Sequence, residues 1–412
     1  MRNRIFLLRL ALRNMMRRKN RTFLTAALIS AAVLVYLFLD SHLASMDEIS
    51  YENIINFSSS HIQITTESYW EEKDDFPLEH LLIPGEELLS AAAGAEGFKA
   101  FSPRLDFAAR INDGFDELPV IARGVDPVRE KEVFLTGGYF VEGGFFEEEG
   151  IVMGAELASL MNLGEGDYVT LIFRTRHEYF NTIDAEITGL LHTPNPGVNE
   201  NIVYVPLETA RRALETEDML SHIMVRLSER NLAAQAASSI SEEAGAGIKV
   251  TPWHELEAVA VNQAKNAGNN LILFIILLIA GLGIINSVIL SALERVHETG
   301  MMKAMGVEEK DIVKLFMTES AAIAVIGALS GCLLGALSIL FLRRYGIDYT
   351  SFFGELSQYG IPMIGPVYGA WEPKSFILVF LFSVSVAVIS SVFPARWAAK
   401  KEPVEALQGK GA

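Results

Sequence analysis

The side chains of this sequence that could carry out chemistry do not assemble into a catalytic motif. The His-Glu pairs that begin at His177 and His254 each lack the second histidine of an H-E-x-x-H zinc site, so no metal centre is expected. The run Gly327-Ala-Leu-Ser-Gly331 has its serine one position too late for the G-x-S-x-G turn that exposes a nucleophile. The sequence therefore does not predict an enzyme.

The sequence also lacks the loop that binds nucleotide phosphates. No stretch matches G-x-x-x-x-G-K-[ST], and the ending Gly409-Lys410-Gly411 has neither the upstream glycine nor a following helix. Binding of ATP through such a loop is excluded for this sequence. We expect no cofactor to be bound by this chain.

Three glycines spaced by four residues, Gly327, Gly331 and Gly335, indicate helix packing instead of chemistry. On one helix they form a smooth stripe, which lets the backbone of a second helix approach closely inside a membrane. We expect tight packing along this stripe, either within the subunit or across a dimer.

A short charged segment, residues 294–315, is the other candidate for function. It begins Glu-Arg-Val-His-Glu-Thr-Gly-Met-Met-Lys-Ala-Met-Gly and continues into a charged stretch. This pattern is typical of a helix broken at its glycines. The segment is either a solvated helical turn or a projection that a soluble partner moves.

Apolar helices must position these residues. A bilayer core is about 30 Å thick, so a helix needs ~20 mostly apolar residues to cross it. Four stretches qualify in a chain of mean hydropathy +0.28, and we expect membrane spans at 22–43, 269–293, 316–342 and 375–397. Proton pumps and ion-coupled transporters need ionisable side chains in the middle of their spans. Here Asp40 and Glu319 lie near the ends of their spans, so these two classes of transporter are disfavoured. We assign Ser287 and Asn286 to hydrogen bonding between helices.

The distribution of charge predicts the orientation of the spans. Residues 1–21 carry eight basic side chains and no acidic one, which places this end in the cytoplasm. Their spacing also predicts an amphipathic helix on the membrane surface. Four crossings return the tail, residues 398–412, to the cytoplasm together with the 294–315 link. Residues 44–268 and the loop 343–374 then lie outside the cytoplasm.

The large outer segment reads as an α+β domain. Residues 46–266 carry 39 acidic and 15 basic side chains, a net charge of −24, which disfavours nucleic acid as a partner. The only cysteine, Cys332, lies in an apolar run, so no disulfide can form within one copy. Short strands alternate with helices, such as a helix over 156–164 that ends at a glycine, and two subdomains are possible. Residues 192–201 read as a loop of a length that often carries function.

Five stretches of the sequence resemble one known family. The link has Glu294, Arg295, Glu298, Gly300, Ala304 and Gly306, followed by Phe316 and Glu319, and it resembles the FtsX-like, MacB-type permeases of ABC transporters. Residues 11–22 and 393–407 resemble the same family, as do 152–167 and 203–208 of the outer domain. Thr299 and Val307 depart mildly from the family pattern. The resemblance covers nearly the whole chain.

The resemblance implies a function and a set of partners. It implies a membrane α-helical fold of four transmembrane helices, with the large α+β extracytoplasmic domain inserted between the first and second helices. It further implies a bacterial inner-membrane protein that forms a dimer with a second copy or a homologue. A separate ABC ATPase subunit would bind the ATP and Mg²⁺. The residues implied to contact that ATPase are Glu294, Arg295, Glu298, Gly300, Met301, Lys303, Ala304 and Gly306.

Members of this family differ in what they act on. The layout resembles lipoprotein-releasing permeases most, which implies a lipoprotein or another amphipathic cargo handled at the outer face. A signalling scaffold that controls a cell-wall hydrolase, and MacB-type efflux of peptides or drugs, are the alternatives. The sequence leaves the choice between them open.

Overall fold

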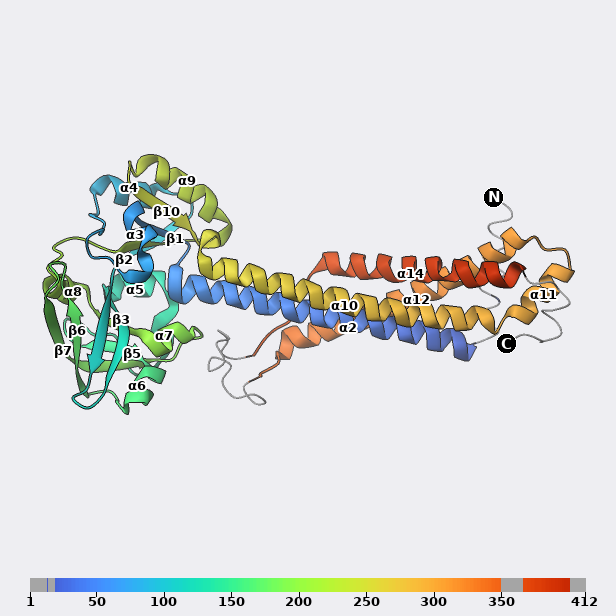
Figure 1. Ribbon diagram of the computed structural model, residues 1–412, viewed down its shortest axis with the longest axis horizontal. Helices are drawn as coiled ribbons and strands as arrows, with labels where there is room; N and C mark the ends of the chain where they lie inside the picture. The colour runs from blue at the N-terminus through green and yellow to red at the C-terminus, as the bar shows by residue number, and fades with distance from the viewer. Residues whose placement is uncertain (1–12, 14–18, 350–365, 401–412) are drawn as a thin grey trace. The chain divides into compact units, whose positions relative to one another are not determined.

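The chain folds into two compact units. The computed structural model describes residue 13 and residues 19–349 and 366–400, drawn as ribbons in Figure 1. Residues 19–47, 265–348 and 366–400 form a membrane unit, and residues 48–264 form an outer unit. The surface helix expected over 1–21 and the tail expected over 398–412 lie almost wholly outside the described residues.

Four long helices build the membrane unit: α2 (Lys19–Ile54), α10 (Glu257–Leu293), α12 (Glu309–Tyr345) and α14 (Pro373–Lys400). Within the described residues these are the four helices that are long and apolar enough to cross a membrane. At 1.5 Å per residue, the 36 residues of α2 measure about 54 Å, which exceeds a hydrocarbon core of about 30 Å. The outer ends of α2 and α10 belong to the outer unit.

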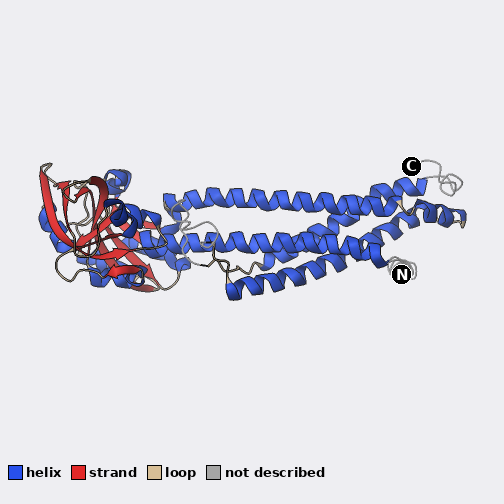
Figure 2. Cartoon of the chain, turned by 90° about the horizontal axis from the view of Figure 1, so that it is seen from below, coloured by secondary structure: helices blue, strands red, loops and turns tan. Residues whose placement is uncertain are grey.

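The helices of the membrane unit share one apolar core. Ile29, Val33 and Leu37 of α2 are buried against Ile284 of α10 and against residues of α12 and α14. Figures 1 and 2 show the helices running alongside one another. The Thr25 and Ser287 hydroxyls lie 3.0 Å apart, which confirms that Ser287 makes a hydrogen bond between helices.

The outer unit is built on one mixed sheet of ten strands in the described residues, ordered β10-β1-β9-β2-β3-β8-β5-β7-β4, with β6 pairing to β2 and β7. Pairing is antiparallel except between β3 and β8 and between β5 and β7. The strands are β1 (Ile62–Thr66), β2 (Phe98–Asn112), β3 (Glu117–Val125), β4 (Phe140–Gly143), β5 (Ile151–Gly154), β6 (Tyr168–Arg174), β7 (Phe180–Leu191), β8 (Ile202–Pro206), β9 (His222–Leu227) and β10 (Ile248–Pro252). The sheet and the helices between its strands confirm the α+β class.

Short helices cover the sheet and close its core. They are α3 (Glu67–Glu71), α4 (Glu86–Gly94), α5 (Pro127–Val133), α6 (Ala155–Met161), α7 (Pro196–Asn201), α8 (Leu207–Leu214) and α9 (Ala233–Glu243). The start of α5 follows from its sequence, because Asp126 accepts hydrogen bonds from the backbone amides of Val128 and Arg129, and Pro127 begins the helix.

Two local expectations were wrong. Helix α6 ends at Asn162, which adopts φ 54°, and not at a glycine, because asparagine tolerates the left-handed conformation that terminates a helix. The segment 192–201, which we expected to be a loop, contains α7. The helix begins here because the Asn195 side chain accepts a hydrogen bond from the Gly197 amide and Pro196 fixes the backbone of the first turn.

Candidate coupling site

The link between α10 and α12 is a helix, a turn and a second helix. Helix α11 (Val296–Ala304) ends at Met305, and Gly306 adopts φ 87°, a left-handed conformation that glycine reaches without strain. Helix α12 starts after Glu308. The single coupling helix expected over 294–315 is therefore divided, and its second part is the first turns of α12.

A buried ion pair anchors the inner side of this link. Arg295 pairs with Glu319 of α12, and their side chains are only 9% and 10% exposed. Arg295 also donates from Nε to Glu298 Oε2 at 3.2 Å, and its guanidinium lies 5.4 Å from the centre of the Phe316 ring. The planar guanidinium thus joins the start of α11 to the side of α12, as Arg does at fixed carboxylate sites.

Two further contacts hold the far end of α11. The Lys303 Nζ donates to Glu309 Oε1 at 2.8 Å and to the backbone carbonyl of Ala399 at 2.9 Å. Ala399 lies in the last turn of α14, where carbonyls lack partners within the helix and a cation is favoured. Beneath the link, Ala292, Ile312 and Ala395 belong to one buried apolar cluster.

The opposite side of the link is apolar and exposed. Met301, Met305 and Val307 are 43%, 75% and 37% exposed. Of the other residues singled out from sequence, Glu294, Ala304 and Gly306 are exposed and Gly300 is buried. The structure therefore places Arg295, Glu298, Gly300 and Lys303 of the predicted set on an anchoring side and leaves Glu294, Met301, Ala304 and Gly306 exposed. The exposed apolar residues Met301, Met305 and Val307 are called the tip below.

The glycine stripe of α12 lies against α2. A Cβ atom on Gly327 would stand 2.8 Å from the Ala26 carbonyl oxygen, and one on Gly331 would stand 2.8 Å from the Ser30 carbonyl oxygen. At Gly335 the Leu37 side chain would be 2.7 Å away. Real Cβ atoms do not come so close to backbone, so the two helices touch at this distance only because these positions are glycine.

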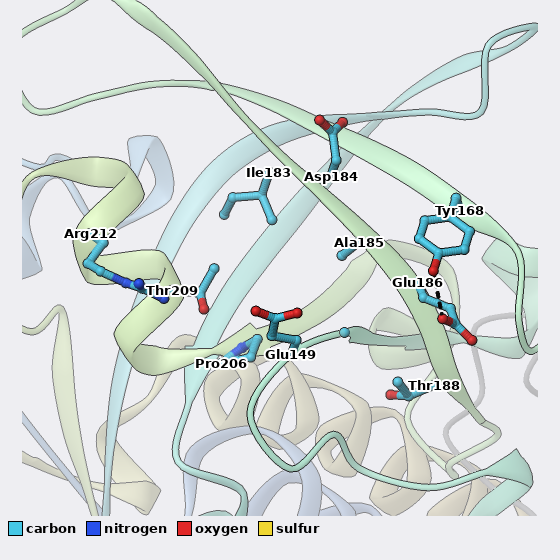
Figure 3. Close-up of a pocket in the computed structure, with 11 residues that line it drawn as sticks. Glu149, Tyr168, Ile183, Asp184, Ala185, Glu186, Thr188, Pro206, Thr209 and Arg212 are labelled. Carbon is cyan, nitrogen blue, oxygen red and sulfur yellow. Dashed lines mark hydrogen bonds between the residues drawn. The ribbon is translucent and has the colours of Figure 1, made fainter.

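A cleft of about 300 Å³ opens on the outer unit where β6 and β7 meet α8 (Figure 3). Its polar lining includes Glu149, Asp184, Glu186 and Arg212, and the Tyr168 hydroxyl donates to Glu186 Oε2 at 2.9 Å. No cluster of three or more His, Cys, Asp or Glu side chains able to hold a metal ion occurs among the described residues. The lining combines these acidic side chains with the Arg212 guanidinium and the hydroxyls of Thr188 and Thr209.

Charged side chains that sequence reasoning missed are buried on one face of the sheet. Arg104 pairs with Glu130, and both side chains are 0% exposed. Arg123 donates to both oxygens of Asp106 at 2.8 and 2.7 Å, and His222 Nε2 lies 3.2 Å from Asp106 Oδ2. Burial opposes ionisation of Asp106, yet Arg123 and His222 hold its pKa well below the ordinary value.

A buried histidine gives the outer unit a predicted pH dependence. Burial and nearby cations, Arg226 first among them, lower the pKa of His61 to about 4, and its Nδ1 accepts from the Leu227 amide at 3.2 Å. The unfolded pKa is about 6.5, so stability is complete above pH ~6.5 and falls as the pH drops toward ~4. The melting temperature, followed by tryptophan fluorescence, should fall through this window. In His61→Gln the melting temperature should fall less over the same pH range. If the melting temperature fell equally with pH in both proteins, His61 would not be the group responsible.

Comparison with known proteins matches both parts of the chain. The MacB-like periplasmic core domain family matches residues 22–243, and the FtsX-like permease C-terminal family matches residues 270–403. An uncharacterized ABC transporter permease of Methanocaldococcus jannaschii is 26% identical over 301 residues, which are 69% of this chain and 69% of that protein.

Further similarities are more partial. The macrolide export ATP-binding/permease protein MacB of Campylobacter jejuni is 28% identical over 239 residues, 55% of this chain and 34% of that protein. The MacB of Pasteurella multocida is 32% identical over 136 residues, 33% of this chain and 18% of that protein. The solved periplasmic region of MacB from Actinobacillus actinomycetemcomitans covers 52% of this chain and 96% of its own, with a TM-score of 0.35 and 12% identity.

The two family matches divide the sequence as the fold does. The MacB-like match takes in α2 and the outer unit through α9, and the FtsX-like match takes in the spans α10, α12 and α14 with the link between the first two. The α+β domain is inserted between the first and second spans, as the sequence predicts. The chain belongs to the family of permeases with a MacB-like periplasmic core domain, and it is an ABC transporter permease of the MacB/FtsX type with an extracytoplasmic domain.

Proposed function

We propose that this chain is a permease subunit worked by a separate ATPase in the inner membrane, and that it moves its outer domain to handle an amphipathic cargo. The observation that carries the proposal is the link after α10, which is anchored on one side by a buried ion pair and exposes an apolar tip on the other. Such a projection can be pushed as a rigid piece, because the anchor ties it to α12.

The proposed partner of the tip is the ATPase subunit. Met305 and Val307 present apolar area, and the exposed acids Glu308 and Glu309 lie beside them, so the partner surface should be an apolar socket with basic residues at its rim. ATP and Mg²⁺ would be bound by that ATPase, and this chain would bind no cofactor. A second copy of the permease, or a homologue, would complete the assembly.

The tip gives the first prediction about assembly. Met305→Glu combined with Val307→Asp should abolish co-purification of the ATPase, because two charges would be buried in an apolar socket. The control is Ile83→Glu on the outer unit, where Ile83 is 68% exposed against 75% for Met305. Its ATPase content should equal that of the wild type. Retention of the ATPase by the tip variant would show that the partner docks elsewhere.

Release of lipoproteins from the inner membrane is the cargo reaction we favour. The spans place few ionisable groups at membrane depth, which supports handling of cargo at the outer face over a hydrophilic path through the bilayer. The test reconstitutes the permease and its ATPase in proteoliposomes that carry an acylated lipoprotein. ATP should release the lipoprotein to a soluble lipid-binding acceptor, and release without ATP, or no release with it, would reject this reaction.

Export of small amphipathic compounds is the second candidate. It is favoured by the names of the MacB relatives, which are macrolide export proteins. Cells that overproduce this permease with its ATPase would then gain resistance to macrolides without any gain in lipoprotein release. Resistance alone would select this candidate, and release alone would select the first.

A further inference from the structure

The outer end of α2 finishes in an unusual way inside the outer unit. The α-helix passes at Ile54 into a π-helical turn, η1 (Ile55–Ser59), and the chain then leaves through Ser60 at φ 55°. Such turns are rare and tend to occur at functional sites. The carbonyl groups at a helix end lack partners within the helix and carry partial negative charge, so this end needs donors from elsewhere.

Arg104 of β2 supplies the charged donor. Its NH1 donates to the Ser58 carbonyl oxygen at 3.0 Å, and its Nε donates to Glu130 Oε2 at 3.3 Å. The Glu130 carboxylate also accepts from the Ser102 hydroxyl at 2.8 Å, and the guanidinium lies 3.7 Å from the centre of the Phe134 ring. One fully buried side chain therefore connects the helix end to the sheet and to α5.

Weaker contacts surround this connection. The Ser60 hydroxyl donates to the Val225 carbonyl at 2.9 Å, and Arg226 NH1 donates to Asn56 Oδ1 at 2.8 Å, both toward β9. The Phe57 ring packs edge-on against Tyr139 with centres 5.0 Å apart. These groups limit sliding of the helix end, but Arg104 alone among the groups named here places a full charge on its terminal carbonyls.

We infer that Arg104 is a positioning residue that fixes the end of α2 to the sheet of the outer unit, so that movement of the helix is passed to β2 and α5. Its importance for transport rests on the proposed function, whereas the fixation itself does not. A buried ion pair is weak evidence of stability, because apolar residues of similar volume often replace one without loss. An apolar residue at position 104 would not make the hydrogen bond to the Ser58 carbonyl, which is the contact that the inference rests on.

The variants follow from that argument. Arg104→Met with Glu130→Met removes the charged donor and leaves no unpaired charge, so the outer unit should still fold. The matched control is Arg123→Met with Asp106→Leu, which removes the other buried ion pair of this sheet face. A third variant, Arg104→Lys, keeps a charge beside Glu130 but loses the planar fork that reaches both Glu130 and the Ser58 carbonyl.

The test measures how firmly the helix end is held, with no ATPase present. Spin labels at Glu52→Cys on α2 and Glu208→Cys on α8, in a Cys332→Ser full-length chain in nanodiscs, report a distance distribution. The double variant Arg104→Met with Glu130→Met, and the single variant Arg104→Lys, should each broaden the distance distribution about twofold or more. The Arg123 control should match the wild type. A distribution as narrow as wild type in folded Arg104→Lys and in the double variant would overturn the inference.

A second pair of labels separates this inference from the proposed function. It joins Arg344→Cys of the membrane unit to Glu208→Cys of the outer unit, in chains bound to the ATPase. If the Glu52–Glu208 width increases as expected but nucleotide never changes the Arg344–Glu208 distance in the wild type, the fixation stands and the proposed function fails. If nucleotide changes the Arg344–Glu208 distance equally in wild type and in the Arg104 variants, the proposed function stands and the role of Arg104 in transmission is refuted.

Discussion

Glu319→Leu should abolish ATP-driven release while the chain still inserts in the membrane. The substitution leaves Arg295 with a buried guanidinium whose main counter-ion is gone, and breaking one side of a buried pair costs about 3–5 kcal/mol. Because this pair ties α11 to α12, we expect the link to leave its position before the span itself unfolds. Release of the lipoprotein in proteoliposomes should fall to background. Most of the ATPase should still co-purify with the variant.

The controls distinguish the buried pair from charge in general. Lys314→Met removes a cation that pairs with Asp311 at the surface, where the two side chains are 60% and 39% exposed. Its effect on release should therefore be small. Arg295→Met with Glu319→Leu should restore protein stability but not release, because the apolar pair packs without fixing α11. Normal release by Glu319→Leu would show that the ion pair has no part in coupling.

Gly331→Leu should cause the second large effect, a loss of folded protein in detergent. The first added carbon would meet Val33 Cβ at 2.7 Å and the Ser30 carbonyl oxygen at 2.8 Å, so α2 and α12 must separate along the stripe. Overpacking a well-packed core lowers the free energy of unfolding by about 1–3 kcal/mol. Because the backbone of a helix must move here, we expect a loss at the upper end of that range. Thermal stability of the purified permease, without its ATPase, measures the change.

A glycine elsewhere in the membrane unit provides the matched control. Gly283 lies in α10, and a Cβ there would meet no atom within 4 Å. Gly283→Leu should therefore keep wild-type thermal stability in the same detergent. Equal stability of Gly331→Leu and Gly283→Leu would mean that the close approach of α2 and α12 is not needed for folding.

The sequence predicts well those features that depend on local composition. A run of about twenty apolar residues predicts a span, so the four membrane helices were predictable. The spacing of Gly327, Gly331 and Gly335 predicts a close helix contact, but it cannot name the partner helix. That partner is α2, almost three hundred residues earlier in the chain, and only folding brings it there.

Contacts between distant residues account for what sequence reasoning missed. Arg295 and Glu319 are both named by the family pattern, yet nothing in the pattern says that they pair. Strand β2 was overlooked although it is the longest strand described, because Arg104 and Asp106 interrupt its apolar alternation. Two charged residues two positions apart in an otherwise mainly apolar stretch were the available signal, since burial of such groups requires partners.

We expect nucleotide bound on the cytoplasmic side to move the domain outside the membrane. The most direct measurement uses spin labels at Arg344→Cys, at the outer end of α12, and at Glu208→Cys in the outer unit, in the permease bound to its ATPase. The distance distribution should shift when ATP and vanadate trap the ATPase closed, and it should return with ADP. Identical distributions in both states, with an ATPase that is active and bound, would contradict the account.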